Sequence, residues 1–536
     1  MRGLILVLAA LGGALLAMSA ENAAQCRLRL ELYDADTGKT LPGLVQLRDE
    51  AGQLVPLPEL LSRGFGLEPG PAIHDWWVLP GAQEVTLPYG KYLVRAFSGL
   101  ETSLAELPVQ LTTPRHEARV RLKRFYDASA LGLRSANTHL HLKKLRREQA
   151  DRYLSEAPLA DGLDVVFLSY LERAIEDLEY TSNKYSQADL ARLSHHHGTQ
   201  FGNGEEHRHN FMPQNQGYGH VMLLNIPELI QPVSIGPGIT RQGTDGLPLR
   251  FGIDKARALG STIIWCHNQW GLEDIPNWIM GRLHANNIFD GGTHGSFKHS
   301  FYRYLNAGLR VPFSTGTDWF MYDFSRVYVP GDKPLSAEAW LKVLAEGRSW
   351  ITNGPLLTFK VDDQTPGGTV DCAEPRVVKI VGEAVGRIDF ERLELVQNGR
   401  VIASAKSTAA AGHFRAQLAE AVMVDAPCWF ALRTPPPPVK NDPEFQTPVP
   451  KNEFSCDLFS HTSAVFVSLA GKLPFDLDAA DSLMKEMQES RHFIDAHALF
   501  ADDSERVRVL AIYDEAIGKF GEKITAARKE NRPPGK

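Results

Sequence analysis

Cysteine is scarce in this chain of 536 residues, which contains only five cysteines and no CxxC pair. Five widely spaced thiols exclude a disulfide-rich framework, and an odd number leaves at least one of them unpaired. Cys428 and Cys456 would form one disulfide if their strands were neighbours. Buried, apolar thiols are an equally good interpretation of the same residues.

The chain also lacks an excess of positive charge. Its 57 Lys and Arg residues against 64 Asp and Glu residues give a formal net charge of −7. A protein without a basic field is a poor general binder of nucleic acids, because phosphate binding depends on that field. The apolar fraction of 43% excludes a disordered chain, which needs low apolar content together with high net charge.

Long hydrophobic runs are missing after the N-terminus. Arg2 precedes an apolar run, Gly3–Met18, and small residues follow it, so residues 1–20 are predicted to be a secretory signal peptide. An uncleaved anchor is the alternative, although the run is shorter than the roughly 20 residues that a bilayer span needs. We expect an exported protein, periplasmic or secreted, with no membrane span after signal cleavage.

The remaining sequence changes its pattern three times. Residues 25–125 alternate apolar and polar side chains, as at Leu28, Leu30 and Leu32, which predicts an N-terminal β-sandwich. Residues 126–353 contain continuous apolar runs such as 165–168 and 262–265, typical of strands buried on both faces in a parallel sheet or barrel. Residues 354–472 are predicted to be a β-rich domain and residues 473–536 a helical tail.

Histidine is concentrated in the middle segment. Twelve of the 18 histidines lie between His139 and His299, which is under a third of the chain. His139 and His141 form an H-x-H pair on a strand-like stretch, where residues i and i+2 point to the same face. The other imidazoles and carboxylates next to predicted strands are Glu205, Glu206, His220, His267 and Asp318. Side chains at the carboxyl ends of parallel strands converge, so the pattern predicts a metal centre.

The order of these motifs resembles a known superfamily. The motifs occur in this order: an H-x-H pair, G-x-E, Gly219-His220, a strand-end histidine and G-T-D at Asp318. This order is similar to that of the polymerase-and-histidinol-phosphatase (PHP) superfamily, and most closely to that of its CehA/McbA branch of metallohydrolases. The segment 347–356 is similar to the one that closes the metal domain in that branch. The resemblance implies an α/β fold: a distorted (β/α)7 PHP-type barrel at 126–353, here flanked by β-sandwich-like modules and a short C-terminal helical segment.

The resemblance also implies a ligand set. The first ion would be held by His139, His141, Glu206 and Asp318, and the second by Glu206 as a bridge with His220 and His267. Whether Glu205 or Glu206 bridges stays open, although the G-x-E register favours Glu206. Leu168–Leu171 replaces the Thr-Asp-His of three-metal members and Phe320 replaces their last histidine. We therefore expect two ions, of zinc, manganese or iron.

Further residues are candidates for the substrate pocket. Arg208 and His209 follow the bridging glutamate and would line the pocket, although simple solvation explains them equally well. Asn268 would orient the site, and Trp319 would form an apolar wall. The stretch 281–300, with His284 and His294, is a plausible substrate loop in which His299 would act as an acid or base.

The ligand set that the resemblance implies, together with the predicted signal peptide, predicts an exported metal-dependent hydrolase. A water held between the two cations would lose a proton to Asp318, and the resulting hydroxide would attack the scissile bond. No Gly-rich phosphate loop or Lys/Arg cluster is evident near the ligands, which favours an ester, amide or carbamate in a small-molecule or polymer-derived substrate. A phosphoesterase of the same superfamily and a non-catalytic binding protein on a degenerate barrel are the alternatives.

Overall fold

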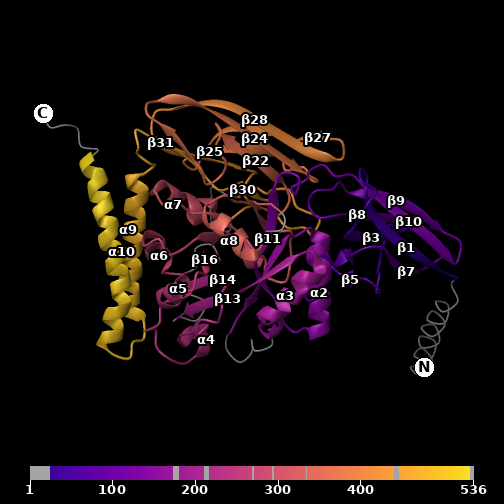
Figure 1. The fold of residues 1–536 in the computed structure, drawn as a ribbon, viewed down its shortest axis with the longest axis horizontal. Coiled ribbons are helices and arrows are strands. Elements are labelled where there is room, and N and C mark those ends of the chain that lie inside the picture. Colours follow the sequence, from indigo (N-terminus) through magenta and orange to yellow (C-terminus); the bar gives the residue numbers. More distant parts are fainter. Residues whose placement is uncertain are drawn as a thin grey trace, which may run out of the picture.

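The computed structural model describes residues 24–172, 180–210, 217–267, 271–292, 295–332, 335–439 and 446–530 (Figure 1). The predicted signal peptide, residues 1–20, lies outside the described residues. β-Strands are the most abundant regular structure of the described residues, with helices against the central sheet and a pair of long helices at the C-terminal end (Figure 1).

Two antiparallel-rich sheets form the N-terminal part of the molecule. One contains β1 (Gln25–Asp34), β2 (Thr40–Leu41), β7 (Gln83–Pro88) and β10 (Arg115–Leu122). The other contains β3 (Gly43–Asp49), β4 (Leu54–Val55), β5 (Leu61–Ser62), β6 (Trp77–Leu79), β8 (Gly90–Phe97) and β9 (Ala105–Leu111). Leu28, Leu30 and Leu32 are fully buried, as their alternation predicts, because one face of β1 packs into the core between the sheets.

A curled sheet occupies the centre. Its strands are β11 (Leu133–His141), β12 (Val165–Tyr170), β13 (Gln200–Asn210), β14 (Gly217–Leu224), β15 (Ser234–Ile235), β16 (Thr262–Trp265), β17 (Ala285–Asn287), β18 (Phe313–Ser314), β19 (Asp318–Trp319) and β20 (Arg326–Pro330). Pairing runs in parallel from β11 to β12 and β13, turns antiparallel at β14 and β16, and is parallel again through β17 and β18. Strand β19 then pairs in parallel with β11, which brings the two ends of the sheet together.

This mixed sheet does not by itself establish the (β/α)7 barrel that the resemblance implies, so the finer architecture stays a prediction. The sheet also crosses the expected domain boundary at residue 353. Strand β20 pairs with β21 (Trp350–Thr352), and β21 pairs with β30 (Ser460–Thr462) of the C-terminal β region. The reason is long-range backbone pairing, which local patterns do not encode.

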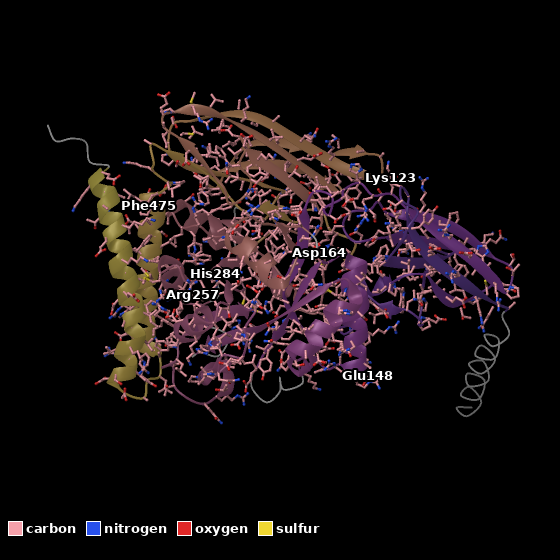
Figure 2. The ribbon with its side chains drawn as sticks, viewed as in Figure 1. Lys123, Glu148, Asp164, Arg257, His284 and Phe475 are labelled. Atoms are coloured by element: carbon pink, nitrogen blue, oxygen red, sulfur yellow. The ribbon has the colours of Figure 1, made fainter. Side chains whose placement is uncertain are left out.

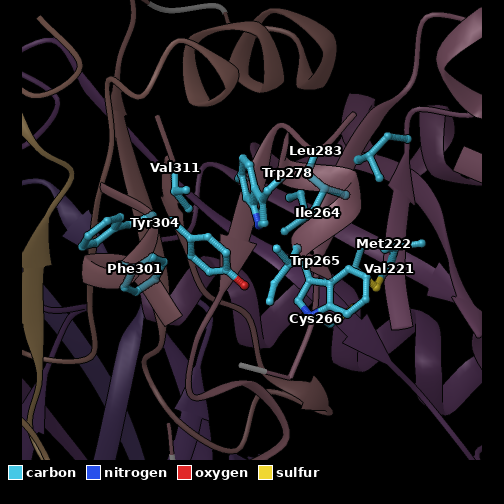
Figure 3. Close-up of a cluster of buried hydrophobic side chains, with 14 of the residues drawn as sticks. Val221, Met222, Ile264, Trp265, Cys266, Trp278, Leu283, Phe301, Tyr304 and Val311 are labelled. Carbon is cyan, nitrogen blue, oxygen red and sulfur yellow. The ribbon is translucent and has the colours of Figure 1, made fainter. Parts of the chain in front are cut away.

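Helices bury the apolar side of the central sheet. They are α2 (Arg147–Asp161), α3 (Gln187–His197), α4 (Pro237–Thr240), α5 (Leu249–Ala258), α6 (Asp274–Ile279), α7 (Arg303–Asn306) and α8 (Ala337–Ala345). Figure 3 shows part of the resulting core, in which Trp265 and Cys266 lie beside Val221 and Met222. The continuous apolar run 262–265 is buried throughout, as expected of a strand covered on both faces.

The C-terminal β region has a second sheet and an extension of the central one. The second sheet contains β22 (Leu356–Val361), β24 (Arg376–Gly386), β27 (Thr408–Ala410) and β28 (His413–Val424). The extension contains β23 (Thr369–Cys372), β25 (Arg392–Gln397), β26 (Arg400–Lys406), β29 (Cys428–Arg433), β30 and β31 (Val465–Leu469). All five cysteines are free, so the disulfide between Cys428 and Cys456 is not formed.

The predicted helical tail consists of α9 (Leu477–His497) and α10 (Asp503–Glu530), which pack against each other along one side of the molecule (Figure 1). Ion pairs fix them to the central region: Arg303 contacts Glu486 at 2.7 Å, and Arg250 contacts Glu515 at 3.1 Å. Among the described helices, none is both long and apolar enough to cross a bilayer.

Candidate metal centre

The structure brings together the six side chains predicted as metal ligands. His139 and His141 lie at the end of β11, Glu206 on β13 and His220 on β14. His267 comes two residues after β16, and Asp318 begins β19 beside β11. All six are nearly or fully buried, with His267 and Asp318 the most exposed at 5% each. The curl of the sheet therefore brings together residues that are up to 179 positions apart in the chain.

The first group consists of His139, His141, Glu206 and Asp318. The Nε2 atoms of the two histidines are 3.0 Å apart, and His141 Nε2 lies 3.1 Å from Glu206 Oε2. Asp318 Oδ1 lies 3.4 Å from His139 Nε2 and 3.6 Å from His141 Nε2. Donors about 2.0–2.1 Å from one tetrahedral ion are roughly 3.4 Å from one another, so this spacing fits a single cation.

The second group consists of Glu206, His220 and His267. Glu206 Oε1 lies 2.9 Å from His220 Nδ1 and 3.1 Å from His267 Nε2. The other oxygen of the same carboxylate, Oε2, faces the first group. Glu206 is thus shared by both groups, one oxygen toward each, which is the arrangement of a bridging carboxylate.

Neighbouring acceptors fix the orientation of the first two imidazoles. The Nδ1–H of His139 donates to Asp290 Oδ2 at 2.9 Å, and the Nδ1–H of His141 donates to the Ser169 carbonyl at 2.8 Å. A carboxylate and a carbonyl only accept, so each neutral ring carries its proton on Nδ1 and directs the Nε2 lone pair toward the centre. Two lone pairs and two carboxylates then face each other, an arrangement that a cation stabilises.

Unpartnered atoms support the same conclusion. Nε2 of His220 and Oδ1 of Asp318 are buried without a hydrogen-bond partner among the described residues. Buried polar atoms of folded proteins are nearly always paired, and an unpaired cluster calls for an ion or another ligand. These buried histidine and carboxylate groups could therefore hold metal ions, and nitrogen with oxygen donors suits a divalent transition metal.

The cluster shifts the pKa values of its members. Burial alone would raise the pKa of Glu206, but Arg208 and the three nearby histidines outweigh it and hold that pKa well below its usual range. Burial raises the pKa of Asp318, and it lowers the pKa of His220 to about 3. His220 is therefore neutral at pH 7, as a metal ligand must be.

Two further residues near the cluster have distinct roles. Cys266 forms a third group with His139 and His267, but burial raises the pKa of its thiol well above the usual value, which disfavours the thiolate that binds metals. Glu205 faces the other side of β13, where Oε2 accepts a hydrogen bond from the Ile230 amide at 2.8 Å and Oε1 is hydrogen-bonded to His207 Nδ1 at 2.8 Å. The geometry thus distinguishes Glu206 from Glu205 as the shared carboxylate.

Two residues predicted to contact substrate lie beside the cluster. Arg208 is buried, with Nη1 at 3.9 Å from Glu206 Oε1. The Trp319 ring lies 5.7 Å from that of His141, and Tyr180 lies 5.6 Å from each of them, measured between ring centroids. Lys143 Nζ is 4.6 Å from the centre of the Trp319 ring. Trp319, Tyr180 and Lys143 therefore adjoin the first group, whereas Arg208 lies near the Glu206 oxygen that faces the second group.

Other predicted substrate residues lie elsewhere. His209 is buried, and its ring nitrogens contact the backbone carbonyls of Leu247 and Pro232. These contacts indicate a role in the fold and not in the substrate pocket. His284 lies beside Arg257, 3.1 Å away (Figure 2), and its Nδ1 accepts from the Ile263 amide. His299 is exposed on the π-helix Lys298–Tyr302 and belongs to none of the ligand groups. Asn268 and His294 lie outside the described residues.

Asp290 is a member of the site that sequence reasoning missed. It is fully buried at the start of the turn Asp290–Gly292, where Oδ2 accepts from His139 and, at 3.1 Å, from the Asn287 amide group. Its Oδ1 lies 3.5 Å from His267 Nδ1, so one carboxylate contacts a histidine of each metal group. The local sequence Asp-Gly-Gly indicates only a turn.

Comparisons of the chain with family models, with curated proteins and with solved structures found no match.

Proposed function

We propose that this protein is a metal-dependent hydrolase that holds two divalent cations, zinc, manganese or iron, in a PHP-type site. The observation that carries the proposal is the placement of Glu206, whose two oxygens face two separate buried histidine groups. A carboxylate shared in this way is typical of two-metal hydrolytic centres. The resemblance of the motif order to the CehA/McbA branch supports the same reaction class.

The chain's own residues would divide the chemistry among them. When bound, the two cations would supply Lewis acidity, which makes a water nucleophilic at neutral pH and polarises the bond to be cleaved. Asp318 would take a proton from that water, and burial, which raises the pKa of its carboxyl group, would make it a better base than an exposed aspartate. Arg208 holds Glu206 ionised and can neutralise negative charge that develops beside it.

The substrate class follows from the wall beside the first group. Trp319, whose ring lies near the buried Tyr180, would offer an apolar surface next to His141, which suits an aryl or alkyl ester, amide or carbamate. A phosphoesterase is the second candidate. It is favoured by Arg208 and Lys143, two cations near the ligands that the sequence did not reveal as a cluster.

A hydrolysis screen tests the proposal. The purified chain, loaded in turn with zinc, manganese or iron, is assayed against aryl esters, aryl carbamates, amides and aryl phosphates. The matched variants are His139→Ala with His141→Ala, which removes two predicted ligands, and His492→Ala with His497→Ala, which removes two exposed histidines of α9. We expect turnover in the wild type and the α9 variant only; turnover in the His139/His141 variant would refute the proposal.

A further inference from the structure

The segment that follows Asp318 has an unusual backbone. Asp318 and Phe320 both have positive φ, 57° and 50°, a region that residues with a side chain rarely adopt. Such conformations persist when the surrounding contacts determine them, and they cluster at functional sites. Asp318 can therefore face His139 and His141 only while its neighbours hold this backbone in place.

Contacts from the central region supply part of that support. The Phe320 amide donates to the carbonyl of His141 at 3.0 Å, which connects the segment directly to a metal-ligating residue. The Phe320 ring is buried edge-on against Tyr153 of α2, 5.7 Å away. The next amide, that of Met321, donates to the Tyr153 hydroxyl at 2.8 Å.

The remaining support comes from the N-terminal β region. Arg63, directly after β5, is completely buried, and its guanidinium donates to the Met321 carbonyl and, at 3.5 Å, to the Asp323 carbonyl. The same guanidinium holds both oxygens of Asp161 at the end of α2, at 3.0 and 2.5 Å. A rigid planar fork can make these contacts simultaneously, whereas a lysine ammonium cannot.

Gly66, three residues after Arg63, lies against the Phe320 ring. A Cβ atom added at Gly66 would be 2.1 Å from Phe320 Cε1, so only glycine leaves room for the ring in its present position. Arg63 therefore fixes the backbone on the carboxyl side of Phe320, and Gly66 limits where its ring can go. Both residues belong to one short loop of the N-terminal region.

From these contacts we propose that the N-terminal β region positions the metal ligand Asp318, through Arg63 and Gly66, and that it is a working part of the metal centre. The inference rests on the proposed function only in taking Asp318 as a ligand. Arg63 and Gly66 are positioning residues, because they act on Asp318 through Met321 and Phe320. A region that merely packed against the centre would stabilise the fold without affecting one ligand.

The test compares two glycine substitutions in the full chain. Gly66→Ala pushes on Phe320, whereas Gly52→Ala places a methyl group where nothing lies within 4 Å, at a similar positive φ (76° against 89°). Both variants carry the same type of backbone strain, so they differ mainly in the contact with Phe320. Zinc binding is measured by competition with a chromophoric chelator, and backbone amide exchange is measured by mass spectrometry over residues 315–325.

We expect Gly66→Ala to bind one of two zinc equivalents about 10- to 100-fold more weakly, as is usual when a ligand loses its supporting contacts. The other equivalent stays unchanged, because Asp318 belongs to the first group alone. Amides of 318–323 exchange faster, and Gly52→Ala behaves as the wild type. Arg63→Lys keeps the charge, and we expect it to show the same weaker binding of one zinc equivalent and the same faster amide exchange. If Arg63→Lys does not fold, the result for Gly66→Ala alone decides.

Wild-type zinc affinity and exchange in Gly66→Ala would overturn the inference. Equal weakening of both zinc equivalents, parallel to a general loss of stability, would overturn it too, since it indicates destabilisation without positioning. If the wild type binds zinc but hydrolyses nothing, the proposed function fails and the inference stands. If the wild type binds no zinc, the proposed function fails, and amide exchange alone tests the inference. Faster amide exchange over 318–323 in Gly66→Ala would then support the positioning of this segment by the N-terminal β region, and unchanged exchange would refute it.

Discussion

Asp290 lies 2.9 Å from Nδ1 of His139, while the other nitrogen of the same ring lies 3.0 Å from His141. The carboxylate thereby favours the tautomer of His139 in which Nε2 could bind a metal ion. Because Asp290 also approaches His267, it contacts one histidine of each group. A single buried side chain thus orients ligands for both predicted ions.

Replacing Asp290 by asparagine tests this role. The amide keeps the size of the side chain but no longer favours a proton on His139 Nδ1, so we expect metal affinity to fall about 10- to 100-fold with the fold intact. Asp245→Asn is the matched control, because Asp245 is also buried but lies outside the ligand groups. Chelator competition measures the affinities. Equal affinities in the two variants would show that Asp290 does not orient the ligands.

The two adjacent glutamates of β13 offer a sharper comparison. Glu206→Gln removes the shared carboxylate, and we expect it to lose both metal equivalents and all turnover. Glu205→Gln replaces a carboxyl group whose pKa burial raises to about 8, so that group is mostly neutral at pH 7 and the amide resembles it. We expect Glu205→Gln to retain metal and activity. Metal analysis of both proteins decides, and the opposite pattern would assign the bridge to Glu205.

Metal removal should destabilise the folded chain. Without a cation, the rings of His139 and His141 and two carboxylates face one another in a buried site with no metal charge among them. An ion that binds only the folded state stabilises it by about 2.7 kcal/mol at a free concentration of 100 Kd. We expect the melting temperature to fall on chelation and to recover when zinc or manganese is added, as followed by circular dichroism. The His139→Ala, His141→Ala double variant should show no such response; an equal response there would place the stabilising ion elsewhere.

The junction between the central region and the helical tail should depend on pH. Asp245 Oδ2 accepts from the Leu499 amide at 2.6 Å, and burial raises the pKa of Asp245 to about 6. A raised carboxyl pKa means that the stability contributed by this group is complete below about pH 4 and is lost as the pH rises through 6.

Asp245→Asn keeps an acceptor for Leu499 but does not titrate. We therefore expect the wild type to lose stability relative to this variant between pH 4.5 and 7.5, measured by urea denaturation at both values. A difference in unfolding free energy that does not change with pH would contradict the assignment.

Local sequence patterns predicted the features that neighbouring residues determine, namely strands, helices and the face to which a side chain points. Alternation identified β1 through Leu28, Leu30 and Leu32, and the predicted helical tail at 473–536 corresponds to α9 and α10. The H-x-H pair indicated that His139 and His141 share a face, because side chains of a strand have a period of two. The order of the motifs and the H-x-H spacing together predicted the residues of the two ligand groups that share Glu206.

Relationships across long sequence distances could not be predicted. The pairing of β21 with β30 joins residues about a hundred positions apart, and neither strand carries a local sign of its partner. Asp290 reads as part of a turn, and its role appears only once His139 and His267 are placed around it. Arg63 reads as an ordinary loop arginine, although it is buried against Asp161 and the segment after Asp318.

The metal content of the purified full chain tests the central claim most directly. After reconstitution with zinc and removal of free ions, elemental analysis should give two equivalents per wild-type chain. It should give none for Glu206→Gln and two for Glu205→Gln. A wild-type chain that retains no metal, or a Glu206→Gln variant that still retains two equivalents, would contradict the account.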